Sequence, residues 1–191
     1  EKSGINLCRK CGFDTAEFRC DPTLLLTADN YRSLYKENDD TFKRKNPYLF
    51  LYMLNNTCDF DIQKVYEFAE RKNLEIVYVT GNGKIDRYEK TFATIPQWLS
   101  LIDNAEYVVT NSFHCCVFSL LFEKKFGVVP LTKTLAGMNS RIETLSEIFG
   151  IKPRWIMEDE SGVFSVLEEE VNPVLQIENE FDLREVLNGK S

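Results

Sequence analysis

One stretch, residues 106–130, constrains the fold of this chain more than any other. Its pattern of β-branched, cap-type and apolar residues predicts a strand, a buried helix and a second strand, at residues 107–110, 113–125 and 126–129. Such a βαβ unit places its two strands parallel, with the helix across one face of the sheet. The chain is therefore predicted to contain a parallel α/β sheet.

Two further apolar runs predict additional buried strands, at residues 48–54 and 74–80. The run 48–54 carries no charge, as expected of a central strand that is covered on both faces. Amphipathic segments predict the connecting helices, from Asp59 or Asp61 to about Lys72, from Pro96 to about Ala105, and from Asn139 or Ser140 to Gly150. Together these elements predict a Rossmann-like open parallel sheet with helices on both faces.

The first 46 residues differ from the rest of the chain because they have too little apolar sequence for a core of their own. They predict a short helix that ends at Gly12, a strand at 16–20, and a further helix followed by a polar connection. We expect residues 1–46 to be the end of a preceding α/β domain and its linker, and residues 47–191 to form a C-terminal domain. The acidic tail predicts two short helices, the last near 182–187.

Charge and hydropathy exclude several classes of function. The chain has 23 basic and 30 acidic residues, a balance that argues against a general nucleic-acid or anionic-membrane surface. Its longest strongly apolar run, residues 115–122, is less than half of the roughly 20 residues that span a bilayer. The first residues also lack the charged and then apolar pattern of a secretory leader. We therefore expect a cytoplasmic protein without a transmembrane segment.

The cysteines predict no metal site. Cys8 and Cys11 have the spacing of a zinc knuckle, but no second pair of zinc ligands follows them. Reduced and mostly buried thiols in a reducing compartment explain the composition better. No cofactor is expected.

His114, the only histidine, lies at the predicted turn between the first strand and the helix of the βαβ unit. In open α/β sheets ligands bind at the carboxyl ends of strands, and a helix N-terminus offers free N–H groups to an anion. His114 is therefore a candidate for catalysis, although a packed, hydrogen-bonded imidazole is the alternative. Ser112 and Asn111 are likewise candidates for binding or only for capping the helix.

Three basic residues are candidates for anion binding. Lys84 and Arg87 follow the predicted strand at 74–80, after Gly81-Asn82-Gly83. Two interpretations stay open: these side chains steer an anion toward the site, or they belong to an ordinary solvated loop. Arg141 is predicted in the first turn of a helix, where its charge opposes the helix dipole. A bound carboxylate or phosphate, or a nearby Glu, would offset that cost.

Several segments stand out when they are taken together: Asp21-Pro22-Thr23-Leu24-Leu25, the run 48–54, Thr110-Asn111-Ser112-Phe113-His114, the run from Val117 to Phe122, and Asn139-Ser140-Arg141-Ile142. This set resembles the C-terminal half of the polysaccharide pyruvyl transferase family. The resemblance extends from near the N-terminus to about Gly150. Some family members carry an Arg at the position of Ser112.

The resemblance implies the C-terminal domain of a two-domain enzyme similar to GT-B glycosyltransferases, with the active site in the cleft between two Rossmann-like domains. Such an enzyme transfers a pyruvyl group from phosphoenolpyruvate to a sugar or lipid-linked oligosaccharide of a surface or exopolysaccharide precursor. The catalytic residue implied is His114, and the implied donor-binding residues are Ser112, Phe113, Asn139, Ser140 and Arg141. The chain is then expected to be incomplete as an enzyme, with an N-terminal domain of roughly 100–200 residues encoded upstream.

Two other classes of function stay open on the sequence. A GT-B-type glycosyltransferase or a nucleotide-sugar epimerase would use a similar domain to bind a nucleotide diphosphate. A noncatalytic binding domain is the third possibility, because a fold alone does not determine function.

Overall fold

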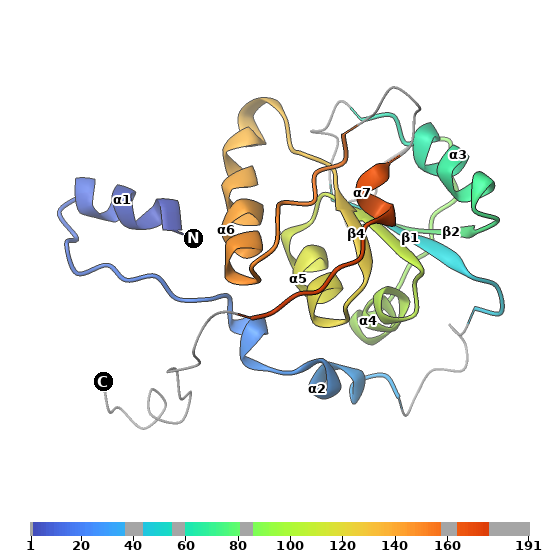
Figure 1. Cartoon of the computed structure of the whole chain (residues 1–191), viewed down its shortest axis with the longest axis horizontal. Helices are drawn as coiled ribbons and strands as arrows, with labels where there is room; N and C mark the ends of the chain where they lie inside the picture. The colour runs from blue at the N-terminus through green and yellow to red at the C-terminus, as the bar shows by residue number, and fades with distance from the viewer. Residues whose placement is uncertain (1, 37–43, 55–59, 81–85, 158–163, 176–191) are drawn as a thin grey trace.

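The computed structural model describes most of the chain, namely residues 2–36, 44–54, 60–80, 86–157 and 164–175. At its centre is a parallel sheet (Figure 1), formed by β1 (Tyr48–Met53), β2 (Glu75–Thr80), β3 (Tyr107–Thr110) and β4 (Lys125–Val128). The strand order is β2-β1-β3-β4, and Leu51 lies opposite Tyr78 of β2 and Val109 of β3. The four predicted strands and their parallel pairing are confirmed.

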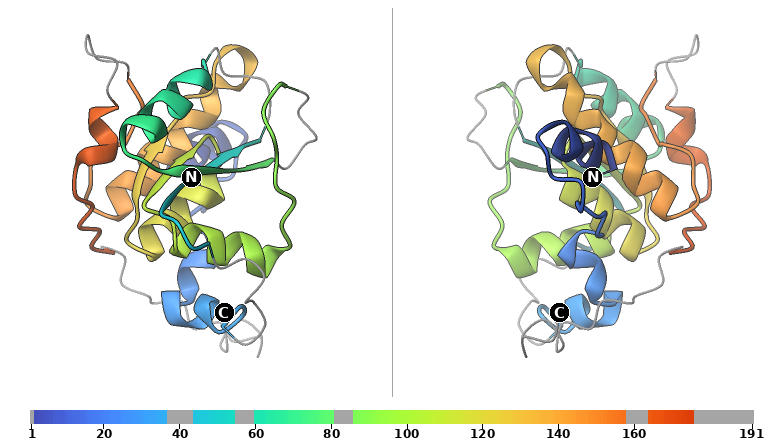
Figure 2. Two further views of the ribbon diagram at one scale, coloured as in Figure 1. Left: turned by 90° about the vertical axis from the view of Figure 1, so that its right-hand side faces the viewer. Right: turned by 90° about the vertical axis from the view of Figure 1, so that its left-hand side faces the viewer.

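Helices cover both faces of this sheet, as predicted (Figure 2). They are α3 (Gln63–Arg71), α4 (Ile95–Asp103), α5 (Phe113–Leu121), α6 (Ser140–Ile148) and α7 (Ser165–Glu168). Apolar side chains of α4, α5 and α6 pack on one face, and those of α3 and α7 pack on the other. The fold is thus the Rossmann-like α/β architecture that the alternating pattern of strands and helices predicts.

The central strand β1 shows why the uncharged run at 48–54 is needed. Side chains alternate along a strand, so Phe50 points into the α4–α5–α6 layer and Leu49, Leu51 and Met53 point into the α3–α7 layer. All four side chains are fully buried. Each contributes about 1.5–3 kcal/mol of hydrophobic stabilisation relative to an exposed side chain.

The helix predicted to run to Lys125 is shorter in the structure. α5 ends at Leu121 because Glu123 adopts a left-handed backbone conformation, with φ of 54°. The N–H of Lys124 then donates to the carbonyl of Ser119 at 2.7 Å and turns the chain into β4. Composition alone does not reveal this end, since no glycine marks it.

The first residues form α1 (Lys2–Lys10), a 3-10 helix η1 (Pro22–Leu25) and α2 (Ala28–Arg32). α1 stands apart from the sheet (Figure 1). The strand predicted at 16–20 is wrong, because those residues make no ladder with any strand of the described chain. The assignment of residues 1–46 to a preceding domain stays a prediction.

α2 is fixed to the α4 and α5 layer by a polar cluster and an aromatic contact. Arg32 donates through Nε and Nη2 to the Asp103 carboxylate at the end of α4, at 2.9 and 3.0 Å. The Tyr35 hydroxyl donates to the same carboxylate. The Tyr31 ring meets Phe118 of α5 edge-on, with centroids 4.8 Å apart. These contacts determine where the segment before α2, including η1, lies on the domain.

After α6 the chain returns to the sheet, where residue 128 of β4 forms a parallel bridge with Trp155. α7 follows, and the second tail helix predicted near 182–187 lies outside the described residues. Within the part of the chain that the structure describes, no helix combines the length and apolar character needed to cross a membrane.

Candidate functional site

The candidate site is built at the carboxyl end of β3, where the chain enters α5. Ser112 caps this helix, as predicted: its Oγ accepts the backbone N–H of Cys115 at 3.4 Å. Its own N–H donates to Oγ1 of Thr110 at 3.0 Å. The Ser112 side chain is buried, and its oxygen is engaged by the helix.

Asn111 has a different role from the cap that its residue type allowed. Its Oδ1 accepts the backbone N–H of Leu54 at 2.8 Å, which ties the end of β1 to the end of β3. The side chain is buried, and its Nδ2 has no hydrogen-bond partner in the described structure. A buried donor in this state costs about 1–3 kcal/mol unless a bound group satisfies it.

His114 is on the surface rather than in the core, since 54% of its side chain is exposed. The alternative interpretation, in which the His114 imidazole is packed in the core, is therefore wrong. Its Nε2 lies 3.6 Å from Oδ2 of Asp21, which is contributed by the segment before η1. Oδ1 of the same carboxylate accepts the N–H and the hydroxyl of Thr23, at 3.0 and 2.6 Å.

Asp21 is ionised in this setting. Burial opposes ionisation, but the hydrogen bonds from Thr23 and the electrostatic interactions with His114 and Arg141 outweigh it and lower the pKa of the Asp21 carboxyl. Sequence reasoning treated Asp21 only as the start of a turn. The available signal was its place in the Asp-Pro-Thr-Leu-Leu segment, one of those that carried the family resemblance.

Arg141 joins the same group of side chains from the start of α6. Its guanidinium lies over the Phe113 ring, 4.2 Å from the centroid. The Phe113 ring also meets the His114 ring edge-on, at 5.4 Å. Arg141 and His114 therefore lie against Phe113 at the N-terminus of α5, and Asp21 lies beside His114.

Asn139 and Ser140 shape the loop that presents Arg141. Asn139 does not cap α6; its side chain instead accepts the N–H of Leu131 at 3.0 Å and donates to the carbonyl of Leu131 at 2.9 Å. Ser140 donates through its hydroxyl to the carbonyl of Gly137 at 2.9 Å. These bonds stabilise the 3-10 helix η2 (Lys133–Asn139), which precedes α6. A role for Asn139 and Ser140 in donor binding stays a prediction.

Two cavities of about 120 Å³ each open beside this group. Phe113 and Arg141 line both of them. One cavity is also lined by residues at the end of β3 and the start of α5, among them Asn111, Ser112 and His114. The other is also lined by Asp21. The predicted site residues at positions 112–114 and 139–141 are thus together in space, except that Ser140 lines neither cavity.

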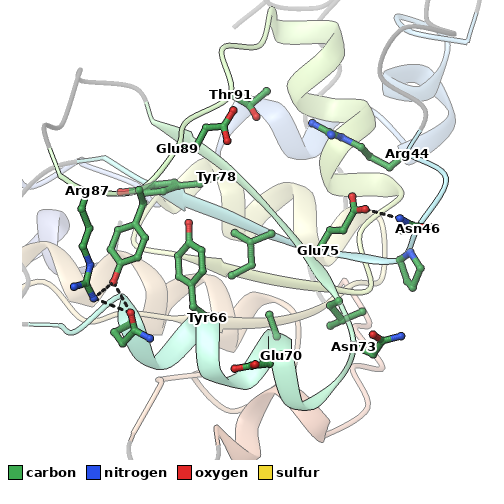
Figure 3. Close-up of a pocket in the computed structure, with 16 residues that line it drawn as sticks. Arg44, Asn46, Tyr66, Glu70, Asn73, Glu75, Tyr78, Arg87, Glu89 and Thr91 are labelled. Atoms are coloured by element: carbon green, nitrogen blue, oxygen red, sulfur yellow. Dashed lines mark hydrogen bonds between the residues drawn. The ribbon is translucent and has the colours of Figure 1, made fainter.

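A larger cavity than these two, about 940 Å³, is elsewhere, along the outer edge of β2 (Figure 3). Arg87 lies there, and its guanidinium donates to Oε1 of Gln63 at 2.7 Å and to the hydroxyl of Tyr88 at 3.0 Å. This cavity shares no lining residue with the two beside His114, so volume alone does not identify the chemical site. Lys84 and the preceding Gly-Asn-Gly lie outside the described residues.

Nothing in the described chain groups three or more potential ligands around a metal position. The adjacent thiols of Cys115 and Cys116 are fully buried in α5. Burial raises the pKa of Cys115 to about 12 and that of Cys116 well above its ordinary value. Both are packing residues rather than nucleophiles.

A sequence profile of the family described as polysaccharide pyruvyl transferase matches residues 1–131. The chain belongs to this family. The matched range contains all four strands, Asp21 and His114, whereas Arg141 lies beyond it. The family is one of transferases, and no curated protein sequence matches the chain.

A solved structure supports the fold. The crystal structure of Methanocaldococcus jannaschii UDP-GlcNAc 2-epimerase, in complex with UDP-GlcNAc and UDP, resembles this member of the pyruvyl transferase family with a TM-score of 0.51. The two sequences are 12% identical over the match, which covers 74% of this chain and 45% of the epimerase chain. The epimerase has a GT-B fold, so the likeness shows the Rossmann-like architecture that such folds contain.

Proposed function

We propose that this chain supplies the donor-binding and acid–base residues of a pyruvyl transferase, which moves a pyruvyl group from phosphoenolpyruvate to a sugar of a surface or exopolysaccharide precursor. The observation that carries the proposal is the grouping of His114 and Arg141 around Phe113 at the N-terminus of α5. Family membership supports a transferase reaction, and this group of side chains supplies the types of residue that pyruvyl transfer requires.

The donor is an anion, and the site has the features of an anion site. Arg141 makes no hydrogen bond with another described side chain, so its N–H groups can bind a phosphate or carboxylate in a bidentate manner. Ser112 caps the N–H of Cys115, which leaves the N–H groups of Phe113 and His114 to the ligand. The positive end of the α5 dipole adds to this attraction.

The chemistry is ketal formation. One acceptor hydroxyl adds its oxygen to C2 of the enol while a proton reaches the C3 methylene, which becomes a methyl group. A second hydroxyl then displaces phosphate from C2 and gives up its proton, so the products are a pyruvate ketal and inorganic phosphate. We assign the proton transfers to His114, because an imidazole can both accept and donate a proton, and the binding of the anionic donor to Arg141 and α5.

Binding of phosphoenolpyruvate, measured by isothermal titration calorimetry, tests the role of Arg141. We expect Arg141→Lys to weaken binding about tenfold or more, since a compact ammonium cannot replace a bidentate guanidinium. Arg87→Lys is the matched control, because Arg87 lies in the separate cavity beside β2. Equal affinities for the native protein and Arg141→Lys would remove Arg141 from the donor site.

The same calorimetry with UDP separates this proposal from the nucleotide-sugar alternative. The named epimerase structure contains UDP, but a likeness at 12% identity extends to the fold alone. We expect UDP to bind no more tightly than inorganic phosphate does. Tight binding of UDP that Arg141→Lys abolishes would favour a nucleotide-sugar enzyme instead.

We further propose that residues 1–46 belong to the end of a preceding α/β domain and its linker, and that residues 47–191 are one side of a cleft that a second domain completes. The half-exposed His114 and the 45% coverage of the epimerase chain support this arrangement. We also propose that the reaction takes place in the cytoplasm, because free thiols such as those of Cys115 and Cys116 are typical of a reducing compartment.

A further inference from the structure

The carboxylate beside His114 is held in one orientation. Oδ1 of Asp21 accepts two hydrogen bonds from Thr23, one from its N–H and one from its hydroxyl. The carbonyl of Thr23 in turn accepts the hydroxyl of Tyr31 at 2.8 Å. Tyr31 belongs to α2 and packs on Phe118 of α5. The helix that carries His114 therefore also positions, through Phe118, Tyr31 and Thr23, the carboxylate that faces the imidazole.

This arrangement leaves Oδ2 of Asp21 for the ring. Oδ2 is 3.6 Å from Nε2 of His114, and an ionised carboxylate can only accept hydrogen bonds. A neutral imidazole has one N–H and one bare nitrogen, and the group beside one nitrogen determines which of the two carries the proton. An acceptor beside Nε2 stabilises the tautomer with the proton on Nε2.

We propose that Asp21 is a positioning residue that holds the His114 imidazole with its proton on Nε2 and leaves Nδ1 to exchange a proton with the substrate. The second half of this statement rests on the proposed function, whereas the first half concerns the free chain. Asp21 touches no reacting atom; it acts through the ring. Oriented imidazoles of this kind occur in other enzymes, where an Asp fixes the catalytic tautomer.

Asp21→Asn provides a direct test because the structure determines how the amide must lie. The two Thr23 donors require an acceptor, so the Asn oxygen takes the place of Oδ1. The amide nitrogen then takes the place of Oδ2 and presents N–H to Nε2. That donor requires a lone pair on Nε2, which moves the ring proton to Nδ1. The substitution is isosteric and keeps both bonds from Thr23, so the fold is retained.

The measurement is ¹⁵N NMR of the imidazole in the full chain, under alkaline conditions in which imidazoles are neutral. His114 is the only histidine, so a single pair of ring signals reports it without an assignment step. We expect the native chain to give the Nε2–H pattern and Asp21→Asn to give the Nδ1–H pattern. Asp29→Asn, which changes an exposed carboxylate of α2 that pairs with Arg32, should match the native pattern.

An unchanged tautomer in Asp21→Asn would overturn the proposal, and so would the same change in Asp29→Asn. The NMR samples contain no phosphoenolpyruvate, so this result is independent of whether phosphoenolpyruvate binds. In the complete enzyme, Asp21→Asn should lower kcat about 100-fold or more without raising KM for phosphoenolpyruvate, given the usual worth of acid–base catalysis. A raised KM for phosphoenolpyruvate with an unchanged kcat would mean that Asp21 contacts phosphoenolpyruvate and is not a positioning residue.

Discussion

His114 takes part in the structure through its backbone and in the proposed chemistry through its ring. The backbone belongs to the first turn of α5, and the ring extends toward solvent between Phe113 and Asp21. The residue types alone predicted that this turn would lie at the carboxyl end of a strand and that Ser112 would cap the helix. They could not predict the Asp21 contact, because it joins segments that are far apart in sequence and meet only through tertiary packing.

Replacement of His114 separates these two contributions. In the complete enzyme, His114→Ala should lower turnover by roughly 10²- to 10⁴-fold, the usual contribution of general acid–base catalysis. Phosphate release from phosphoenolpyruvate in the presence of a polysaccharide precursor measures this change. The melting temperature should stay nearly the same, since more than half of the side chain is exposed. Turnover that survives the substitution would contradict the assignment of His114.

At the scale of elements, the apolar runs were the most informative part of the sequence. The apolar runs predicted that β1 and α5 would be buried, and most of their side chains are. Of these two elements, α5 differs from its prediction in its last turn, because it ends at Leu121. Polar residues were less informative because each has several local partners to choose from. Asn139 is a cap-type residue that bonds to Leu131 instead, and α2 is held by Arg32 and Asp103, a pair that no sequence pattern indicated.

The Asp103 cluster stabilises the docking of α2. Asp103→Asn should destabilise the chain by about 1.5–3 kcal/mol near neutral pH, the typical worth of a hydrogen bond to a charged group. Denaturant unfolding measures the difference. The control Asp29→Asn should lower the free energy of unfolding by less than about 0.5 kcal/mol. The Asp29 carboxylate also pairs with Arg32, but its side chain is 82% exposed. Equal stability of Asp103→Asn and the native chain would show that α2 does not depend on this cluster.

The pH dependence of this contribution has a defined sign. Burial opposes ionisation of Asp103, but hydrogen bonds from Arg32 and Tyr35 outweigh it and lower the pKa of the carboxyl. The pKa of Asp103 in the unfolded chain is about 4, and its pKa in the folded chain is lower. The stabilisation is therefore fully present above the unfolded pKa and is lost as pH falls through the folded pKa. The stability gap between the native chain and Asp103→Asn should therefore narrow under acidic conditions.

In the whole molecule, the candidate site and the cavity beside β2 lie at different places on the sheet. Asp21, His114 and Arg141 meet where β3 leads into α5, whereas the cavity of about 940 Å³ follows the outer edge of β2 and is lined in part by Arg87. The fold class was predictable because buried parallel strands require apolar runs of recognisable length. The separation of Arg87 from the site was not predictable, since Arg87 and His114 both follow strands of the same sheet and only the strand order places them apart.

The most direct test of the account is the place where phosphoenolpyruvate binds. Titration of phosphoenolpyruvate into the ¹⁵N-labelled full chain, followed by NMR, reports each backbone N–H and the ring of the lone histidine. We predict the largest shifts at Phe113, His114 and Arg141, with little change at Tyr66 or Arg87 beside β2. Shifts confined to the β2 cavity, or no shifts at millimolar phosphoenolpyruvate, would contradict the assignment of the donor site to the N-terminus of α5.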